Sequence, residues 1–389
     1  MKSRCLLPLF AALALAGCAN LPAPPAPTAL FADGLFRAPT QPVNGDQALA
    51  LSPAMQQYLD HEIAQQVRRE GGGRQGLISA LYSREQLKLE YDATLTRNAA
   101  EAFEARRGNC MALVLMTAAF AKAMHMPVRF NSVYIDDIWS RSGNLIYVSG
   151  HVNLSLGWRI REGSQQGFTT DMDMLTIDFV PPEMLRGQRS RVITEDTLVA
   201  MYMNNRAAEQ LEQGLLDDAY WWARAAMVRD PHLLAAHNTL GVIYRRHHQP
   251  ELAERVFRAV LAQEPANVQT LSNLILVLQD RRADDEVRLL SARLAELQPD
   301  PPFRYFDEGM RAMRAGDFRA AKRLFTKEIE RSAYFHEFHF WLALANYGLG
   351  DLAEARKHMA LARDNSPTLK DREMYAAKLD RLRAVSRLQ

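Results

Sequence analysis

Apolar and small residues recur at a fixed interval through the second half of the chain. Prolines share one register, alanines a second and glycines a third: Pro231, Pro265, Pro299 and Pro367; Ala219, Ala253, Ala321 and Ala355; Gly214, Gly316 and Gly350. Members of a column stand 34 residues or a multiple of 34 apart, as Pro231 and Pro265 do. Each unit predicts two short amphipathic helices, with the glycine at the turn between them and the proline closing the second helix.

The repeat predicts five units over residues 199–367 and a charged, amphipathic capping helix over residues 368–389. His248 and Arg282 replace glycine in the column that marks the turn. Polar residues interrupt the apolar pattern of the third and fourth units at Asp285, Ser291 and Glu328. We therefore expect the array to be least regular in those two units.

A different pattern precedes the repeat. The run from Met111 to Met126 has its large apolar side chains at helical spacing, which predicts a buried helix. Three short alternating segments then predict β-strands: Val128–Tyr134, His151–Leu156 and Met174–Phe179.

A candidate reactive group stands at the start of this helix. Cys110 lies in the first turn, with Asn109 as the expected N-cap. Free backbone N–H groups and the positive end of the helix dipole favour a thiolate there, and the same amides are suited to hold an oxyanion. Gly108 would leave room for a substrate beside the sulfur. His151 opens the second strand and Asp178 lies near the end of the third.

The N-terminus predicts export. Four residues with two positive charges precede an apolar run from Cys5 to Ala16, which is too short for the ~20 residues of a membrane-spanning helix. This is typical of a secretory signal, here over residues 1–17. The proline-rich sequence within residues 18–45 shows no helix or strand period and predicts an extended tether.

The segment Leu15-Ala16-Gly17-Cys18 resembles the lipobox of bacterial lipoproteins. The resemblance implies cleavage before Cys18 and attachment of lipid to that cysteine. Ala19, rather than aspartate, follows it, which by analogy with the family places the protein at the outer membrane, facing the periplasm. The alternative is an ordinary cleaved signal with a chance cysteine.

Charge and cysteine content limit the kinds of partner and of reactive group that the chain can have. The formal charge of +2 becomes 2 − 2 = 0 when Lys2 and Arg4 leave with the signal, which argues against a nucleic-acid partner. Of the three cysteines, Cys5 leaves with the signal and Cys18 would carry lipid. Cys110 then remains as a single thiol in an oxidising compartment, either as a reactive group or as a small buried apolar residue.

The second unit carries a recognisable set of residues: Leu240-Gly241, Tyr244, Ala253, Phe257 and Pro265. In these positions it resembles the tetratricopeptide repeat (TPR). The resemblance implies an all-α solenoid whose concave groove binds a protein or peptide partner. The alternative is an array used only for packing or dimerisation.

Four motifs upstream resemble the transglutaminase-like superfamily of papain-like cysteine enzymes: Gly108-x-Cys110, Pro127-Val128-Arg129, His151-Val152 with Gly157-Trp158, and Ile177-Asp178-Phe179. The resemblance implies an α+β domain of papain-like fold over residues 46–198. It implies Cys110 as nucleophile on an amide carbonyl, His151 as base and acid, and Asp178 as the group that orients the ring. Animal transglutaminases use calcium, but neither Asp136-Asp137 nor the pair of Asp171 and Asp173 has the spacing of a dedicated calcium loop, so we expect no metal and no cofactor.

The chain departs from this family's pattern in places. No tryptophan follows Cys110, and Asn153 stands where many members have tryptophan or valine. An insertion over residues 161–170 leaves Asp171 and Asp173 as alternatives to Asp178. Two hypotheses remain: an envelope lipoprotein that hydrolyses or transfers amide acyl groups through a thioester, with the repeats docking a partner or substrate, or a catalytically inactive scaffold for envelope protein interactions.

Overall fold

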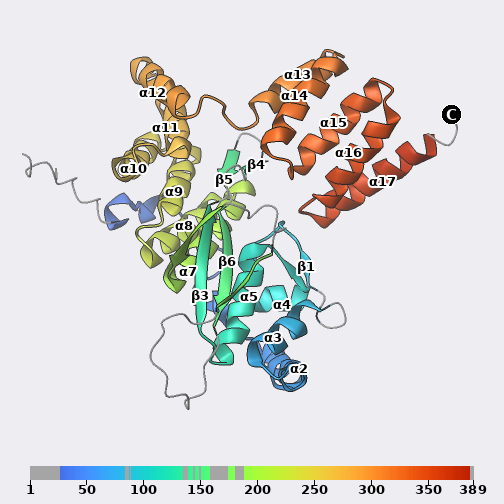
Figure 1. Ribbon diagram of the computed structural model, residues 1–389. Coiled ribbons are helices and arrows are strands. Elements are labelled where there is room, and N and C mark those ends of the chain that lie inside the picture. The colour runs from blue at the N-terminus through green and yellow to red at the C-terminus, as the bar shows by residue number, and fades with distance from the viewer. Residues whose placement is uncertain are drawn as a thin grey trace, which may run out of the picture.

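The computed structural model describes residues 27–83, 87, 89–134, 139–142, 145–148, 150–157, 174–179 and 188–385. Helices dominate these residues, and the strands among them all lie before the first helix of the repeats (Figure 1). A part that mixes helices and strands is thus followed by helix pairs, as the sequence predicts.

Short helices build the N-terminal part around one long, buried helix. Their bounds are η1 (Pro27–Leu30), η2 (Asp33–Leu35), η3 (Asp46–Leu49), α1 (Pro53–Tyr58), η4 (Leu59–Ile63), α2 (Ala64–Glu70), α3 (Gly73–Tyr82), α4 (Ala99–Ala105) and α5 (Cys110–Ala123). Between them, β1 (Glu90–Tyr91) pairs in parallel with β2 (Arg107–Gly108). Every residue of α5 from Met111 to Ala121 is buried, which confirms the predicted core helix.

A four-stranded antiparallel sheet lies against α5 (Figure 1). Its order is β7 (Leu175–Ile177), β6 (His151–Leu156), β3 (Val128–Tyr134) and β8 (Arg189–Ile193), and a separate hairpin pairs β4 (Trp139–Ser142) with β5 (Leu145–Val148). The three predicted strands are confirmed, the third being shorter than expected. Val152, Leu154 and Leu156 are fully buried, as their alternation predicts.

Five helix pairs and a final helix make up the array over the described residues 188–385. The pairs are α7 (Glu195–Glu212) with α8 (Leu216–Arg229), α9 (Leu234–Arg246) with α10 (Pro250–Gln263), α11 (Val268–Asp280) with α12 (Asp284–Leu297), α13 (Arg304–Arg314) with α14 (Phe318–Arg331), and α15 (His336–Gly348) with α16 (Leu352–Asp364). Helix α17 (Leu369–Val385) follows in the place of the predicted cap.

The backbone explains the glycine column. Gly214, Gly316 and Gly350 have φ angles of 79°, 75° and 79°, in the left-handed region that glycine adopts without strain. His248 and Arg282 hold the same place in their units with φ angles of 57° and 58°. The turn geometry is therefore kept where the glycine is lost.

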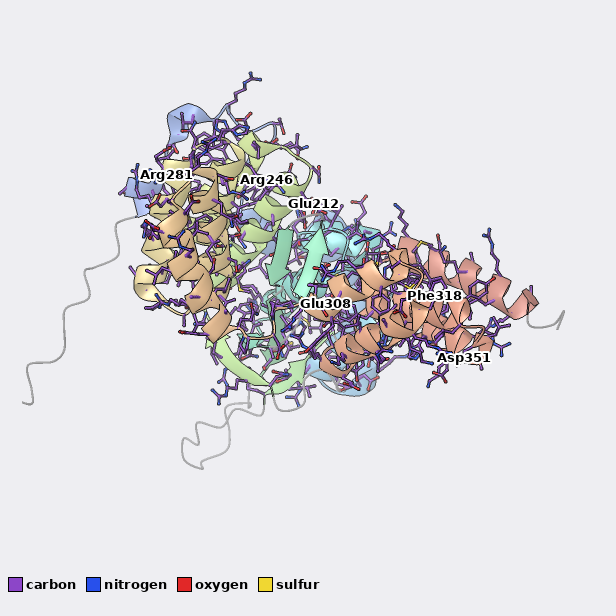
Figure 2. The ribbon with its side chains drawn as sticks, turned by 90° about the horizontal axis from the view of Figure 1, so that it is seen from above. Glu212, Arg246, Arg281, Glu308, Phe318 and Asp351 are labelled. Atoms are coloured by element: carbon purple, nitrogen blue, oxygen red, sulfur yellow. The ribbon has the colours of Figure 1, made fainter. Side chains whose placement is uncertain are left out.

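The array is interrupted between its third and fourth units, where the sequence predicts the least regularity. Helix α12 has no buried residue, and Leu289 on it is 68% exposed. A separate apolar cluster begins at Phe303. In the view from above, the labelled residues of the two stacks lie apart: Glu212, Arg246 and Arg281 in one, Glu308, Phe318 and Asp351 in the other (Figure 2).

Glu328 has a structural use that its place in an apolar pattern does not predict. Its side chain is 3% exposed, and Oε1 accepts the backbone N–H groups of Tyr305 and Phe306 at 2.8 and 3.2 Å. These amides belong to the first turn of α13, where the backbone N–H groups have no acceptor within the helix itself. The carboxylate therefore caps a neighbouring helix.

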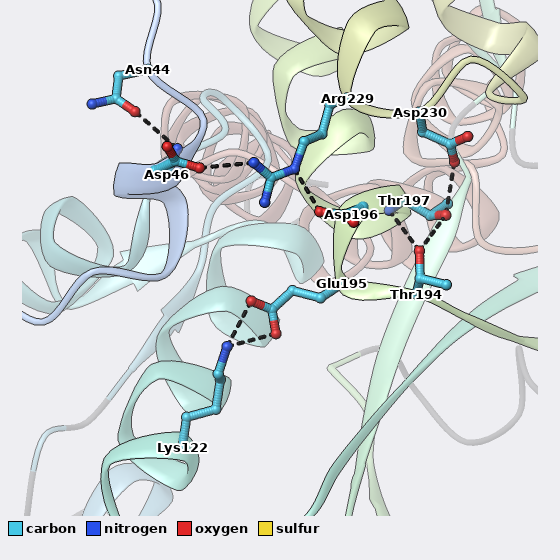
Figure 3. A network of polar contacts seen from close by, with 9 residues as sticks. All are labelled: Asn44, Asp46, Lys122, Thr194, Glu195, Asp196, Thr197, Arg229 and Asp230. Carbon is cyan, nitrogen blue, oxygen red and sulfur yellow. Dashed lines mark hydrogen bonds and ion pairs between the residues drawn. The ribbon is translucent and has the colours of Figure 1, made fainter.

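The two parts of the chain share one buried core. The predicted boundary between residues 198 and 199 falls inside α7, and a single apolar cluster runs from the N-terminal part through α11. Ion pairs lie where the N-terminal part meets the first repeat helices. Arg229 lies 2.7 Å from Asp196 and 2.8 Å from Asp46, and Lys122 lies 2.6 Å from Glu195 (Figure 3).

Residues 27–49 differ from the extended tether that the sequence predicts. This N-terminal strap packs against the first two helix pairs: the Phe36 ring stacks on Tyr220 with centroids 3.9 Å apart, and Tyr244 donates a hydrogen bond to the carbonyl of Leu30 at 2.8 Å. Thr40 donates its backbone N–H to Asp218 at 2.7 Å. Leu30 and Phe36 are isolated apolar residues that follow no helix or strand period. The sequence pattern therefore could not predict that they are buried against distant helices.

Candidate active site

Cys110 begins α5, as predicted. Asn109 is the N-cap, and its side-chain oxygen accepts the N–H of Ala112 at 2.9 Å. Its amide group donates to the Thr96 hydroxyl at 2.9 Å, which holds the cap in one orientation. The Cys110 side chain is partly exposed at the positive end of a helix whose residues from Met111 to Ala121 are buried. The sulfur therefore lies beside the free backbone N–H groups of the first turn.

The three residues predicted as catalytic meet at one point. His151 is the first residue of β6 and is 3% exposed. Its Nε2 lies 2.7 Å from Oδ1 of Asp178, which directly follows β7. Cys110 is close enough to the His151 ring for the charge of its side chain to raise the pKa of the ring.

Burial lowers the pKa of His151, but hydrogen bonds to Asp178 and Cys110 and the negative charges of both groups outweigh it and raise the pKa to about 9. The ring is therefore protonated and positively charged at neutral pH. A cation within hydrogen-bond reach of the sulfur stabilises the thiolate, which is the nucleophilic form of cysteine.

Asn153 holds the carboxylate of Asp178 in place. Its Nδ2 donates to Oδ2 of Asp178 at 2.7 Å, so that the two carboxylate oxygens receive His151 and Asn153 separately. Asn131 on β3 in turn donates to Oδ1 of Asn153 at 2.9 Å. Asn153, which departs from the pattern of the transglutaminase-like superfamily, thus holds Asp178, the third of the predicted catalytic residues. The strict alternation of β6 places Asn153 on the same face as His151, which was the available signal for this role.

The pairing of β1 with β2 brings two more residues to the cysteine. Gly108 is buried, and a Cβ added there would lie 2.7 Å from the Cβ of Ala112. Close packing on α5 therefore requires this glycine, rather than space for a substrate as the sequence suggested. Tyr91 lies opposite Gly108 in the strand register, which places it beside the start of α5. No sequence motif indicated Tyr91.

Several predicted residues lie outside the described part of the chain. They are Cys18, Trp158, Asp171 and Asp173, together with the signal over residues 1–17. Among the described residues, no three His, Cys, Asp or Glu side chains are gathered in a way that could bind a metal ion. No helix within that same part combines the length and apolar character needed to cross a membrane.

Residues 306–369, which cover the fourth and fifth helix pairs, match the family model of the tetratricopeptide repeat. The chain contains a tetratricopeptide repeat region. Such repeats are protein-interaction elements, so the region indicates a protein or peptide partner. No curated protein matches the chain.

Solved structures similar to this chain include three TPR-like proteins. One is PilF of Pseudomonas aeruginosa, 18% identical with a TM-score of 0.27, over 49% of this chain and 94% of that chain. A second is MamA, 18% identical with a TM-score of 0.25, over 44% and 93% of the two chains. The third is YrrB, a TPR protein with an unusual peptide-binding site, 18% identical with a TM-score of 0.25, over 46% and 92%.

Proposed function

We propose that the chain is a cysteine enzyme of transglutaminase-like type that opens an amide bond through a thioester on Cys110. One observation carries this proposal: Nε2 of His151 lies 2.7 Å from Oδ1 of Asp178, and the ring is close enough to Cys110 for the charge of that side chain to raise the pKa of His151. A thiol, a base and a carboxylate that orients the base are the elements of nucleophilic acyl transfer. An inactive scaffold would have no need of this contact.

Each residue has a defined part in the reaction. The Cys110 thiolate attacks the carbonyl carbon, and a C–S bond forms while the π electron pair moves to oxygen. When the intermediate collapses, the C–N bond breaks, and the imidazolium of His151 gives its proton to the leaving amine. Asp178 holds the ring and stabilises its charge. Water or an amine then attacks the thioester, which gives hydrolysis or acyl transfer.

The repeat region would bind the protein or peptide that carries the amide bond. The first repeat helix is linked to the site through Thr96, because Glu209 of α7 accepts the backbone N–H of Thr96 at 2.6 Å and Thr96 in turn binds Asn109. A protein or peptide held by the first helix pairs would therefore be presented by elements that share a core with the helix of the nucleophile. The proposed substrate class is an amide bond in a protein or peptide.

The proposal includes a location. The lipobox-like Leu15-Ala16-Gly17-Cys18 supports a lipid-anchored protein of the bacterial envelope, at the outer membrane facing the periplasm. Cys18→Ala is expected to abolish labelling of the protein by a fatty-acid probe fed to cells that export it, and to release it from the membrane fraction. Cys5→Ala is the matched control and should leave both unchanged. Full labelling of the Cys18 variant would refute the anchor.

The pH dependence of Cys110 alkylation tests the enzymatic proposal. An isolated cysteine ionises near pH 8.5, so its reaction with iodoacetamide slows about tenfold for each pH unit below that value. The raised pKa of His151, about 9, keeps the ring positive below pH 9, so that a cation stands close to Cys110 at pH 6–7. We expect wild-type alkylation at pH 6 to exceed that of His151→Gln by roughly 100-fold.

The advantage should disappear as the pH rises through 9, because the imidazolium then loses its proton. His232 is an exposed histidine of the first inter-repeat loop, and His232→Gln should behave as wild type. Superimposable pH profiles for wild type and His151→Gln would show that Cys110 is not activated.

A further inference from the structure

The loop between β1 and α4, residues 92–98, contains neither helix nor strand. At its start, Asp92 donates its backbone N–H to the carbonyl of Gly108 at 3.0 Å. Further along, Thr96 is buried, and its hydroxyl accepts a hydrogen bond from the side-chain amide of Asn109 at 2.9 Å. The loop therefore contacts both of the residues that stand directly before the nucleophile.

The repeat array holds this loop through its backbone. Oε1 of Glu209 on α7 accepts the N–H of Thr96 at 2.6 Å, and Nη1 of Arg206 donates to the carbonyl of Thr96 at 3.3 Å. At the other end of the array, the carbonyl of Pro367 accepts the N–H of Ala93 at 3.0 Å. A loop whose backbone groups are not paired in a helix or sheet takes its conformation from such contacts.

Glu209 and Arg206 form an ion pair that is mostly buried, with Nε of Arg206 3.7 Å from Oε2 of Glu209. Removing two charges from water costs about as much free energy as their attraction returns, so apolar residues would join α7 to the loop equally well. The ion pair differs from apolar residues in one respect, since it binds both the N–H and the carbonyl of Thr96. This specificity points to the placing of Thr96 rather than to adhesion between the two parts of the chain.

The orientation of Thr96 reaches the nucleophile through the N-cap. The Asn109 side chain donates to Thr96 with its nitrogen and accepts the N–H of Ala112 with its oxygen, each at 2.9 Å. An N-cap side chain that is held at both ends keeps the first turn of a helix from fraying. Cys110 is the first residue of that turn, so the position of its sulfur depends on the cap.

We propose that Glu209 and Arg206 are positioning residues for the reaction of Cys110, so that the first repeat helix completes the active site. They orient Thr96, Thr96 orients Asn109, and Asn109 sets the start of α5. This inference rests on the proposed function, and it adds that the repeats belong to the catalytic machinery as well as to partner binding.

The pH profile of Cys110 alkylation by iodoacetamide tests the assignment. At pH 10 the thiol is ionised in every variant, so the ratio of the rate at pH 6 to the rate at pH 10 reports how well the folded site stabilises the thiolate. Glu209→Ala is expected to lower this ratio about 10-fold, because the first turn of α5 loses its fixed position. Glu209→Gln keeps an oxygen acceptor for the Thr96 N–H and should recover most of the ratio.

Glu254→Ala is the matched control. The Glu254 side chain is 15% exposed, against 16% for Glu209, and it also pairs with arginines, Arg258 and Arg281, but it lies on α10. Its substitution removes an equally buried carboxylate from the repeats and should leave the ratio unchanged. If Glu209 were merely structural, both variants would lower the urea midpoint of unfolding and neither would change the ratio.

Thr96→Val interrupts the same series of contacts at the next bond. Valine keeps the backbone groups that bind α7 and lacks the hydroxyl that accepts from Asn109. The ratio should fall to the level of Glu209→Ala, and the double variant should fall no further, because both substitutions act through one series of contacts. Where Glu209→Ala does not fold, Thr96→Val decides the question.

A wild-type ratio in Glu209→Ala or in Thr96→Val would overturn the assignment, and so would a ratio in Glu209→Gln as low as that in Glu209→Ala. Failure of the proposed function gives a different result. The wild-type protein itself then has the same ratio as His151→Gln, and the assignment falls with the function.

Discussion

Asp178→Asn is expected to lower the rate of Cys110 acylation by roughly 10⁴-fold. Oδ1 of the carboxylate accepts from Nε2 of His151 and from the backbone N–H of Phe179, and Oδ2 accepts from Nδ2 of Asn153, each at 2.7 Å. An asparagine has one oxygen, so its NH₂ group must face one of these donors. The ring then adopts the wrong tautomer or turns away, and the charge that stabilises the imidazolium is lost. Burst acylation by 4-nitrophenyl acetate measures the effect.

Asp285→Asn provides the matched control, since Asp285 is 96% exposed on α12, and its ion-pair partner among the described residues is Arg288. It should leave the burst unchanged. If Asp178→Asn acylates within a few-fold of wild type, Asp178 is not the orienting carboxylate. Asp171 and Asp173 would then be the residues to replace next.

Phe36→Ala is expected to destabilise the core shared by the strap and the first repeats by about 3–5 kcal/mol. The ring is 7% exposed, stacks on Tyr220 with an interplanar angle of 5°, and lies 4.6 Å from the ring of His247. Its removal leaves a cavity between elements that are far apart in the sequence. Urea denaturation followed by circular dichroism measures the loss.

Leu35→Ala is the control for this prediction, because the neighbouring Leu35 is 41% exposed. It should change the free energy of unfolding by less than about 0.5 kcal/mol. Equal, small effects of the two substitutions would mean that the strap is a detachable tether, as the sequence pattern predicted.

The strap also bears on the proposed anchor. From Cys18 to the start of η1 at Pro27 the chain advances 27 − 18 = 9 residues. Fully extended, nine residues span at most about 30 Å. A lipid on Cys18 would therefore hold the folded part of the protein, with Cys110, close to the membrane surface rather than at the end of a long linker.

Much of the repeat architecture was predictable because its determinants are local and periodic. The glycine column marks left-handed turns, the proline column follows the second helices, and the alanine column is fully buried at Ala219, Ala253, Ala321 and Ala355. The polar interruptions also indicated where the array would break. Glu328 shows the limit of this reasoning, since its partners, Tyr305 and Phe306, lie on another helix.

The sequence by itself determined the helix pairs, the buried helix that begins at Cys110, and the order of the cysteine, histidine and aspartate. Each depends on side-chain period, capping or spacing along one segment. Only the tertiary structure decided that Asn153 holds Asp178, that Tyr91 lies opposite Gly108 beside the start of α5, and that Phe36 packs against Tyr220. These contacts depend on strand register and on the packing of distant elements, which no single segment encodes.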